Sequence, residues 1–267
     1  MLTQLTLYYE LRKKVSFFVD KLSLEKTVNT IGRKLSLSLT DILTTGLFKH
    51  LAQITTKKRL WQLLEFSCSY KTLVVNINRF SLLALKLLFI LLRYNRLNTH
   101  LVKHVDSTDI PVCSNHKATR HQVMKTLANW GKTGKGWFYG LKMHLVSDLK
   151  GRLLSIKFTS GKTDDRAVVL TLSKDLDGVF IGDAGYVSQE LAKNFYQEGK
   201  RYFLAKPRAN MRKLATLTEI WLYNTRMKIE LNFRSLKQFY GLVSTLPRSI
   251  NGYLANYVYS LLAYCLG

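Results

Sequence analysis

The sequence is short of three residue types, and each shortage narrows the possible functions. Among 267 residues there are only 17 Asp and Glu, 3 Pro and 3 Cys. Cys68, Cys113 and Cys265 are odd in number and widely separated, which argues against a disulfide framework or a zinc knuckle and favours a reducing cytoplasm. Since 47% of the residues are apolar and prolines are few, a disordered basic tail is excluded and a folded protein is indicated.

The shortage of acids leaves a large excess of positive charge. With 41 Lys and Arg, the formal net charge is +24 and the sequence pI is about 10.0. This excess predicts a polyanionic partner, of which nucleic acid is the commonest. The first 105 residues contain 17 basic and 5 acidic side chains, and the remaining 162 contain 24 and 12. Both parts are therefore equally basic, and a nucleic acid would contact both.

Long hydrophobic runs are also lacking. The best candidate, residues 80–92, has 13 residues and includes Lys86, whereas a helix that spans a bilayer needs about 20 apolar residues. We interpret this run as a buried helix. The N-terminal stretch contains Glu10 and no small-residue cleavage site, so neither a secretory signal nor a membrane partner is expected.

The hydrophobic periodicity divides the chain at about residue 100. Residues 1–100 follow helical patterns and predict an all-helical domain, either a bundle with a merely solvated basic face or a DNA-contacting domain. Residues 101–267 alternate strand-like and helical segments and predict an α/β domain with a mixed sheet flanked by helices. The expected strands are 101–106, 136–148, 151–160, 178–183 and 201–205, and the expected helices are 57–66, 80–92, 163–175, 187–199, 222–240 and 250–266, with a further helix capped by Thr40 and Asp41.

Because acids are scarce, their positions are informative. Asp106 ends the first expected strand and Asp183 ends the fourth, and strand ends in α/β sheets are where ligands bind. Two such carboxylates, with a third from a helix, would form an all-oxygen site for Mg²⁺ or Mn²⁺. A pair of these ions can clamp both oxygens of a phosphodiester displacement. Taken singly, Asp106 also fits a turn former and Asp183 a helix N-cap.

The third carboxylate is predicted to be Glu230. At about 100° per residue, the expected helix 222–240 has an apolar edge for packing on the sheet and a polar edge beside it. Basic side chains next to a metal-bound carboxylate are suited to holding phosphates. The alternative, an exposed Glu230 paired with an arginine four residues away, stays open. The polar edge consists of Tyr223, Arg226, Glu230, Arg234 and Lys237.

The segments that contain these residues resemble a known family. The strings HVDSTDIPVC, GWFYGLKMHLV, FIGDAGYVS and YNTRMKIELNFRSLK are similar to the DDE transposases of bacterial insertion sequences. Within the last string, Tyr223, Arg226, Glu230 and Lys237 stand as Y-x2-R-x3-E-x6-K, which resembles the signature helix of one branch of that superfamily. The resemblance is strong over 101–267. It implies an RNase H-like catalytic core with Asp106, Asp183 and Glu230 as the metal-binding triad and two Mg²⁺ or Mn²⁺ ions per active site.

Three further acids lie in segments that resemble the family: Asp109 in HVDSTDIPVC, and Asp164 and Asp165 in GKTDDRA, another such segment. Asp109 competes for the first position of the triad, but Asp106 is preferred because it directly follows the apolar strand and precedes a serine. Asp164 and Asp165 are predicted to cap a helix rather than to act in catalysis.

The resemblance implies a transposase that cleaves transposon ends and joins them to target DNA by two-metal phosphoryl transfer. Its expected partners are double-stranded DNA, comprising terminal inverted repeats and target, and a second copy in a homodimeric synaptic complex; its expected location is the cytoplasm, with the nucleoid. The alternatives are a metal-dependent nuclease or resolvase on the same core and an inactive DNA-binding remnant. Lys132 and Lys135 lie in a Gly-punctuated loop that is either a DNA contact or merely solvated. The predicted DNA-binding residues are Tyr223, Arg226, Arg234, Lys237, Lys132 and Lys135.

Overall fold

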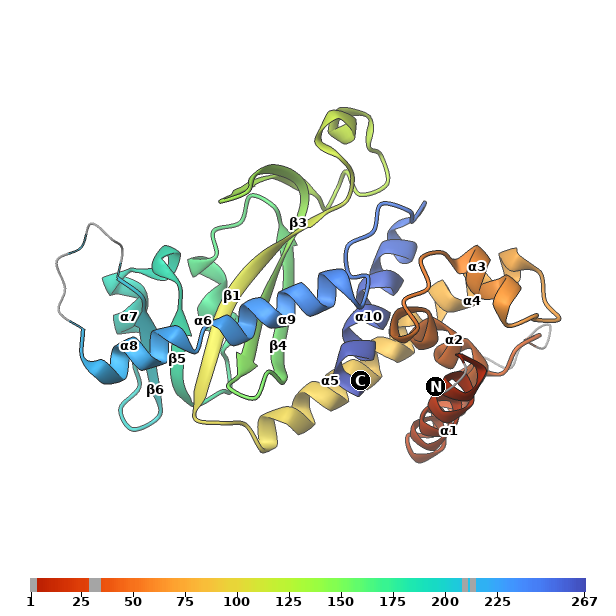
Figure 1. Ribbon diagram of the computed structural model, residues 1–267, viewed down its shortest axis with the longest axis horizontal. Coiled ribbons are helices and arrows are strands. Elements are labelled where there is room, and N and C mark those ends of the chain that lie inside the picture. Colours follow the sequence, from red (N-terminus) through yellow and green to blue (C-terminus); the bar gives the residue numbers. More distant parts are fainter. Residues whose placement is uncertain (1–3, 29–34, 208–210, 212–214) are drawn as a thin grey trace. The chain divides into compact units, whose positions relative to one another are not determined.

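The computed structural model describes residues 4–28, 35–207, 211 and 215–267, which form a mixed α/β structure (Figure 1). Packing divides the chain into two compact units: Met1–Phe89 together with Leu236–Gly267, and Ile90–Ser235. These units are defined by internal contacts and not by function. The functional boundary predicted at residue 100 therefore stays a prediction.

The first unit is helical in its described residues. Helix α10 packs against α2 and α4, and α1 packs against α2. Ser38 caps α2 by accepting a hydrogen bond from the backbone N–H of Asp41, so this helix begins slightly before the predicted cap at Thr40 and Asp41. The elements of this unit are α1 (Gln4–Lys21), η1 (Leu24–Thr27), α2 (Leu39–Leu51), α3 (Lys57–Leu63), α4 (Tyr70–Arg79), the start of α5 (Ser81–Leu97) and α10 (Ile250–Leu266).

The apolar run at residues 80–92 forms most of α5, but it is buried along one stripe only. Ala84 and Leu88 are buried, whereas Leu82 is 71% exposed and Phe89 is 58% exposed. The prediction of a buried helix is therefore wrong for its outer face. In the described part of the chain, no single helix is long and apolar enough to span a membrane; α4 and α5 pass together by length and composition but are bent by 41°.

Gly46 allows α2 and α10 to approach closely. A Cβ atom at this position would lie 2.4 Å from Cε1 of Tyr259, a ring that is 1% exposed. Forcing a larger side chain into such a packed contact costs about 1–3 kcal/mol. We expect Gly46→Val to lower the free energy of unfolding by about that amount, measured by urea denaturation. Gly134→Val is the matched control, because a Cβ there meets nothing within 4 Å; equal losses in both variants would contradict the packing argument.

The second unit is built on a six-stranded mixed sheet with the order β2-β3-β1-β5-β6, in which β4 also pairs with β3. Strand β3 is antiparallel to β1, β2 and β4, whereas β1, β5 and β6 are mutually parallel. The predicted α/β class is thus confirmed, with a mixed sheet flanked by helices. The strands are β1 (Val102–Pro111), β2 (Asn129–Thr133), β3 (Gly136–Asp148), β4 (Leu153–Ser160), β5 (Gly178–Gly182) and β6 (Arg201–Ala205).

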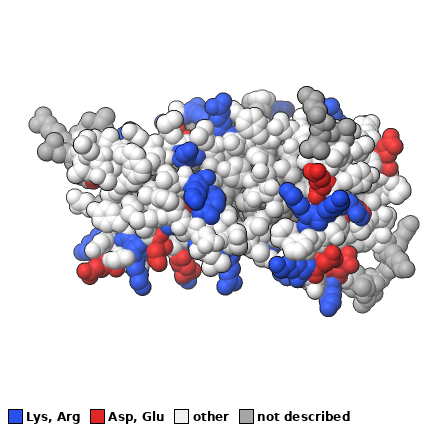
Figure 2. All heavy atoms as spheres, turned by 60° about the horizontal axis from the view of Figure 1, so that its bottom comes forward, with Lys and Arg blue, Asp and Glu red and all other residues white. Residues whose placement is uncertain are grey.

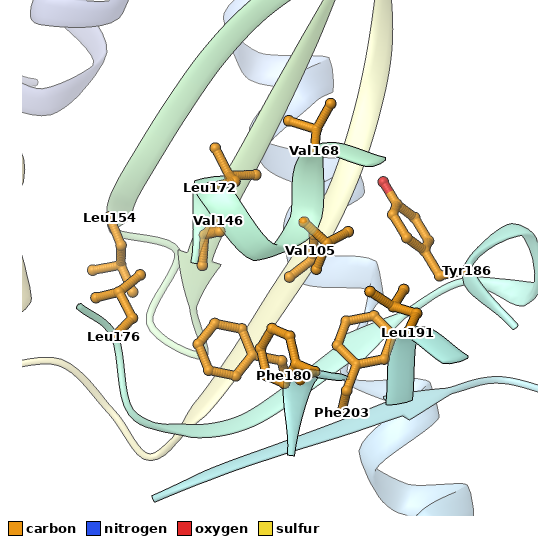
Figure 3. Packing of buried hydrophobic residues seen from close by; sticks show 12 residues of the cluster. Val105, Val146, Leu154, Val168, Leu172, Leu176, Phe180, Tyr186, Leu191 and Phe203 are labelled. Carbon is orange, nitrogen blue, oxygen red and sulfur yellow. The ribbon is translucent and has the colours of Figure 1, made fainter. Parts of the chain in front are cut away.

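Helices cover both faces of this sheet. The cluster drawn in Figure 3 joins Val105 of β1 to α6 and α7. On the opposite face, Leu222 and Tyr223 of α8 pack against Val102 of β1. Since side chains alternate along a strand, Asp106 shares the face of Val102 and turns towards α8 and α9. The helical elements of this unit are η2 (Asn115–Arg120), α6 (Arg166–Leu172), η3 (Ala184–Tyr186), α7 (Gln189–Phe195), α8 (Leu217–Asn224) and α9 (Met227–Gln238), the last of which continues to Gln238 in the first unit.

Three sequence-based predictions of this unit are wrong. The strand expected over 101–106 continues to Pro111, so Asp106 lies in the middle of β1 and not at its end. The single helix expected over 222–240 is split into α8 and α9 at Thr225, whose hydroxyl donates to the carbonyl of Leu222 at 2.6 Å and lies 2.8 Å from Nε2 of His104. The loop expected around Lys132 is partly strand β2, which pairs with β3. Because the helix is split, the line of polar side chains predicted for one continuous helix holds only for the residues of α9.

Candidate active site

Asp106 and Asp183 lie on neighbouring parallel strands. In the pairing of β1 with β5, Val102 faces Val179 and His104 faces Ile181. Continued by two residues, the same register places Asp106 beside Asp183, which directly follows β5. The expectation that Asp106 ends its strand is wrong, because β1 continues to Pro111. The two carboxylates lie side by side because the shorter strand β5 ends beside the middle of β1.

Asp106 is a largely buried carboxyl group. Its side chain is 16% exposed, and its Oδ1 accepts a hydrogen bond of 2.8 Å from the backbone N–H of Ser107. Burial raises the pKa of Asp106 to about 7, against the lowering effects of this hydrogen bond and of Arg226, and the charges of Asp183 and Asp165 raise it further. The site therefore concentrates negative charge where water is largely excluded.

Asp183 also has a local structural role. Its Oδ1 accepts a hydrogen bond of 2.8 Å from the backbone N–H of Gly185 and so caps the short turn η3. The N-cap alternative is therefore confirmed for this residue. Because a carboxylate has further lone pairs, capping leaves oxygen sites that can accept another ligand.

Glu230 is paired with Arg226, which also contacts Asp106. Its side chain is 61% exposed, and its Oε1 lies 3.4 Å from Nη2 of Arg226, the helix pairing that was the alternative prediction. The same Nη2 lies 3.6 Å from Oδ2 of Asp106. Arg226 thus stands between two carboxylates of the predicted triad.

The predicted DNA-binding residues fall into two groups. Lys132 on β2, Lys135 in the β2–β3 turn and Arg234 on α9 are exposed, and Lys237 is half-buried. Tyr223 is 8% exposed in the core beneath α8, and Arg226 is 16% exposed among carboxylates. The exposed group is accessible to a DNA strand as folded, whereas Tyr223 and Arg226 present little surface.

A known protein family matches the part of the chain that contains the acidic residues on β1 and directly after β5. A family model described as a transposase DDE domain matches residues 97–250, more than half of the chain. This protein belongs to the transposase DDE domain family. The matched range includes Asp106, Asp183 and Glu230. No curated protein matches the sequence.

A solved structure similar to this DDE-family chain is piggyBac transposase, in a cryo-EM synaptic complex with hairpin DNA. The TM-score is 0.56 and the sequence identity is 13%, and the alignment covers 99% of this chain and 73% of that chain. At this identity the similarity is one of fold.

Two residues beside the acidic site were missed or misassigned by the sequence-based prediction. Asp165 stands at the N-cap position of α6 but makes no capping hydrogen bond, so the capping prediction is wrong for it. Its Oδ1 instead lies 3.0 Å from Nζ of Lys142 and 3.8 Å from Nδ1 of His144. Tyr186 is 2% exposed; burial raises its pKa well above the usual value, and the charges of Asp106, Asp165 and Asp183 add to this.

The only sequence signal for these two residues is their position in the segments GKTDDRA and GDAGY, which resemble the family. Their neighbours on β3 could not be inferred from spacing. By contrast, Asp164 pairs with Arg166 at 2.7 Å at the surface, and Asp109 lies opposite Lys142 in the β1–β3 register, further along β1 than the end of β5. This placement favours Asp106 over Asp109.

Some of the acidic side chains of the DDE domain are suited to binding a divalent cation. Asp106 and Asp183 supply hard oxygen ligands from adjacent strands. The pKa of Asp106 is raised mainly by burial and to a lesser extent by the charges of Asp183 and Asp165, and a bound cation would favour its ionised form. Within the described ranges, however, no group of three or more His, Cys, Asp or Glu is arranged to hold a metal ion. Asp106 and Asp183 lie on adjacent strands, whereas Glu230 pairs with Arg226.

Proposed function

We propose that this protein is a DNA transposase that cleaves transposon ends and joins them to target DNA. The observation that carries the proposal is the pair Asp106 and Asp183, which extends the register of two adjacent parallel strands inside a transposase DDE domain. The mixed sheet, in which β3 is antiparallel to β1, β2 and β4 while β5 and β6 continue parallel to β1, supports an RNase H-like core.

Asp106 and Asp183 are the proposed ligands of a divalent cation, with Glu230 as the third ligand. Such a metal, when bound, supplies an activated water and stabilises the leaving 3′ oxygen. Glu230 would exchange its pairing with Arg226 for this role; its exposure leaves the side chain free of packing constraints. The buried Nε of Arg226 has no hydrogen-bond partner in the described structure, so its present position is incompletely satisfied.

The proposed DNA contacts include side chains that are already exposed and others that would have to move. Lys132 and Lys135 stand beside Trp137, whose ring lies 5.7 Å from Nζ of Lys132 and is 59% exposed. Basic and aromatic side chains together are suited to a nucleic-acid strand. Arg234, Lys237 and a released Arg226 would hold phosphates, and Tyr223 would support α8 from within the core.

The finer identity follows from the sequence resemblance and belongs to the same proposal. We infer an origin in a bacterial insertion sequence, with Tyr223, Arg226, Glu230 and Lys237 as the signature positions. A homodimeric synaptic complex, two Mg²⁺ or Mn²⁺ ions and a cytoplasmic, nucleoid-associated location go with this proposal.

A joining assay tests the proposal. The full-length protein is incubated with Mg²⁺, a labelled duplex that carries the inverted repeats flanking the gene, and a supercoiled target plasmid. We expect both cleaved ends and labelled target, and neither product when EDTA replaces Mg²⁺. Cleaved ends without labelled target would instead indicate the nuclease or resolvase alternative. Binding without cleavage would indicate an inactive remnant.

A further inference from the structure

The positive charge of this protein is unevenly distributed over its surface. On the face drawn in Figure 2, Lys and Arg side chains stand in small separate groups, several of them beside acidic side chains, with uncharged areas between. Concentrations of cationic groups without acids nearby are therefore informative when they do occur.

One such concentration lines a cavity of about 540 Å³ in the helical unit. The cavity is formed by the end of α2, the start of α3, one side of α4 and the segment leading into α10. Lys49, Lys57, Lys58 and Arg248 line it, and no Asp or Glu is among its lining residues. Four cationic side chains from three separate segments of the chain thus face one space.

Two of these lysines are held in a conformation that is costly without an anion. Burial lowers the pKa of Lys49 to about 8 and that of Lys57 to about 8, and the charge of Lys49 adds to the lowering at Lys57. Nζ of Lys57 donates to Oδ1 of Asn78 at 2.7 Å. In the described part of the chain, neither lysine forms an ion pair with an acid. The unit therefore maintains two desolvated, mutually repelling ammonium groups at the wall of an open cavity.

The other lining groups are suited to the same kind of ligand. Helix α10, of 17 residues, begins at Ile250 beside Arg248 and Ser249, so the positive end of its dipole adds to the field of the lysines. Tyr70 also lines the cavity and is 42% exposed, which leaves part of its ring available for stacking. The volume is that of a site for a ligand of nucleotide size.

A second cavity, of about 510 Å³, adjoins the first and shares Lys49, Thr55, Ser244 and Leu246 with it. It also has no acidic side chain among its lining residues. Together, the two adjoining cavities, which share Lys49, offer more volume than a single phosphate or nucleotide requires. This combined volume favours a segment of polynucleotide strand over a free small molecule.

We propose that the helical unit contains a second DNA-binding site, in which Lys49, Lys57 and Arg248 hold a backbone phosphate of a DNA strand at the cavity wall. The proposal rests on the proposed function for the identity of the polymer. The site belongs to a different unit from Asp106 and Asp183, and its occupant is recognised by phosphate charge and by stacking rather than by sequence.

Equilibrium binding of the full-length protein to a labelled DNA duplex, measured over a range of salt concentrations, tests this proposal. The variant is Lys49→Gln combined with Lys57→Gln, and the matched control is Lys13→Gln combined with Lys26→Gln, two exposed lysines that line neither cavity. We expect the cavity variant to bind DNA about tenfold or more weakly and to lower the salt slope by about one or two, as the loss of phosphate contacts predicts. The control should change affinity less than about threefold. Equal effects in the two variants, or no effect in the cavity variant, would overturn the proposal.

Inorganic phosphate and a nucleoside monophosphate serve as competing probes that distinguish the source of the phosphate. If either probe competes with DNA for binding to the wild type but not to the cavity variant, the result supports a phosphate site that DNA uses. If probe binding depends on the two lysines but DNA affinity does not, the assignment of the site to DNA is overturned. A thermal melt of each variant accompanies the titrations; because the substitutions remove desolvated charges, we expect no loss of stability. The experiment measures binding without Mg²⁺, so failure of cleavage or joining would leave its result intact.

Discussion

Replacing Asp183 with Asn is expected to lower the rate of transposon-end cleavage by about a thousandfold or more, while DNA affinity stays within about threefold of the wild type. Asn keeps the size of the side chain and an oxygen that can accept the hydrogen bond from Gly185, so the cap of η3 is preserved. What is lost is one negative charge beside Asp106. If the charge pair exists to bind a cation, cleavage depends on it and folding does not.

Asp177→Asn is the matched control for this experiment. Asp177 immediately precedes β5 and is exposed, whereas Asp183 follows the other end of the same strand. The control should cleave at the wild-type rate. Cleavage that survives Asp183→Asn would exclude the proposed metal role, and equal loss of activity in both variants would point to a general effect of charge on DNA binding.

Strongly periodic elements could be predicted closely from the sequence. The bounds of β3, β6 and α10 agree with prediction, because each is a patterned segment between clear turn or loop signals. The split between α8 and α9 could not be predicted in this way. It depends on Thr225 meeting His104, a residue more than a hundred positions away whose ring contacts it only after β1 and α8 have packed. A long-range hydrogen bond of this kind leaves no periodic trace in the sequence.

In the candidate site, too, some contacts could be predicted from the sequence and others could not. The proximity of Asp106 and Asp183 follows from the parallel pairing of β1 with β5, which sequence patterns can indicate, although β1 extends beyond Asp106 to Pro111. The contact of Arg226 with Asp106 and the pairing of Asp165 with Lys142 depend on side-chain direction across the fold. Helical spacing correctly gave the alternative partner of Glu230. It could not decide between a metal and Arg226, because that choice depends on the position of Asp106 on β1.

Asp106→Asn is expected to stabilise the metal-free protein at pH 8 and to leave its stability nearly unchanged at pH 4. Burial raises the pKa of Asp106 from its ordinary value of 3.8 to about 7, so between these values the folded protein keeps a proton that the unfolded chain releases. Wild-type stability therefore falls as the pH rises from about 4 to about 7, by up to about 4 kcal/mol in total, and stays lower above pH 7. Asn cannot ionise, so the variant lacks this fall. Urea denaturation in EDTA at several pH values measures the difference.

Two comparisons make the pH experiment specific to the buried site. Asp164→Asn removes a surface carboxylate whose pKa is lowered by hydrogen bonds from Arg166, so this variant should lose a little stability above pH 4 instead of gaining it. Mg²⁺ at a hundred times its dissociation constant should restore about 2.7 kcal/mol to the wild type at pH 8 and much less to Asp106→Asn. If the free energy of unfolding depends on pH in the same way for wild type and Asp106→Asn, then Asp106 ionises in the folded protein without a loss of stability. A gap that opens with pH in EDTA and closes with Mg²⁺ would show that the same burial that disfavours the lone carboxylate prepares it to receive a cation.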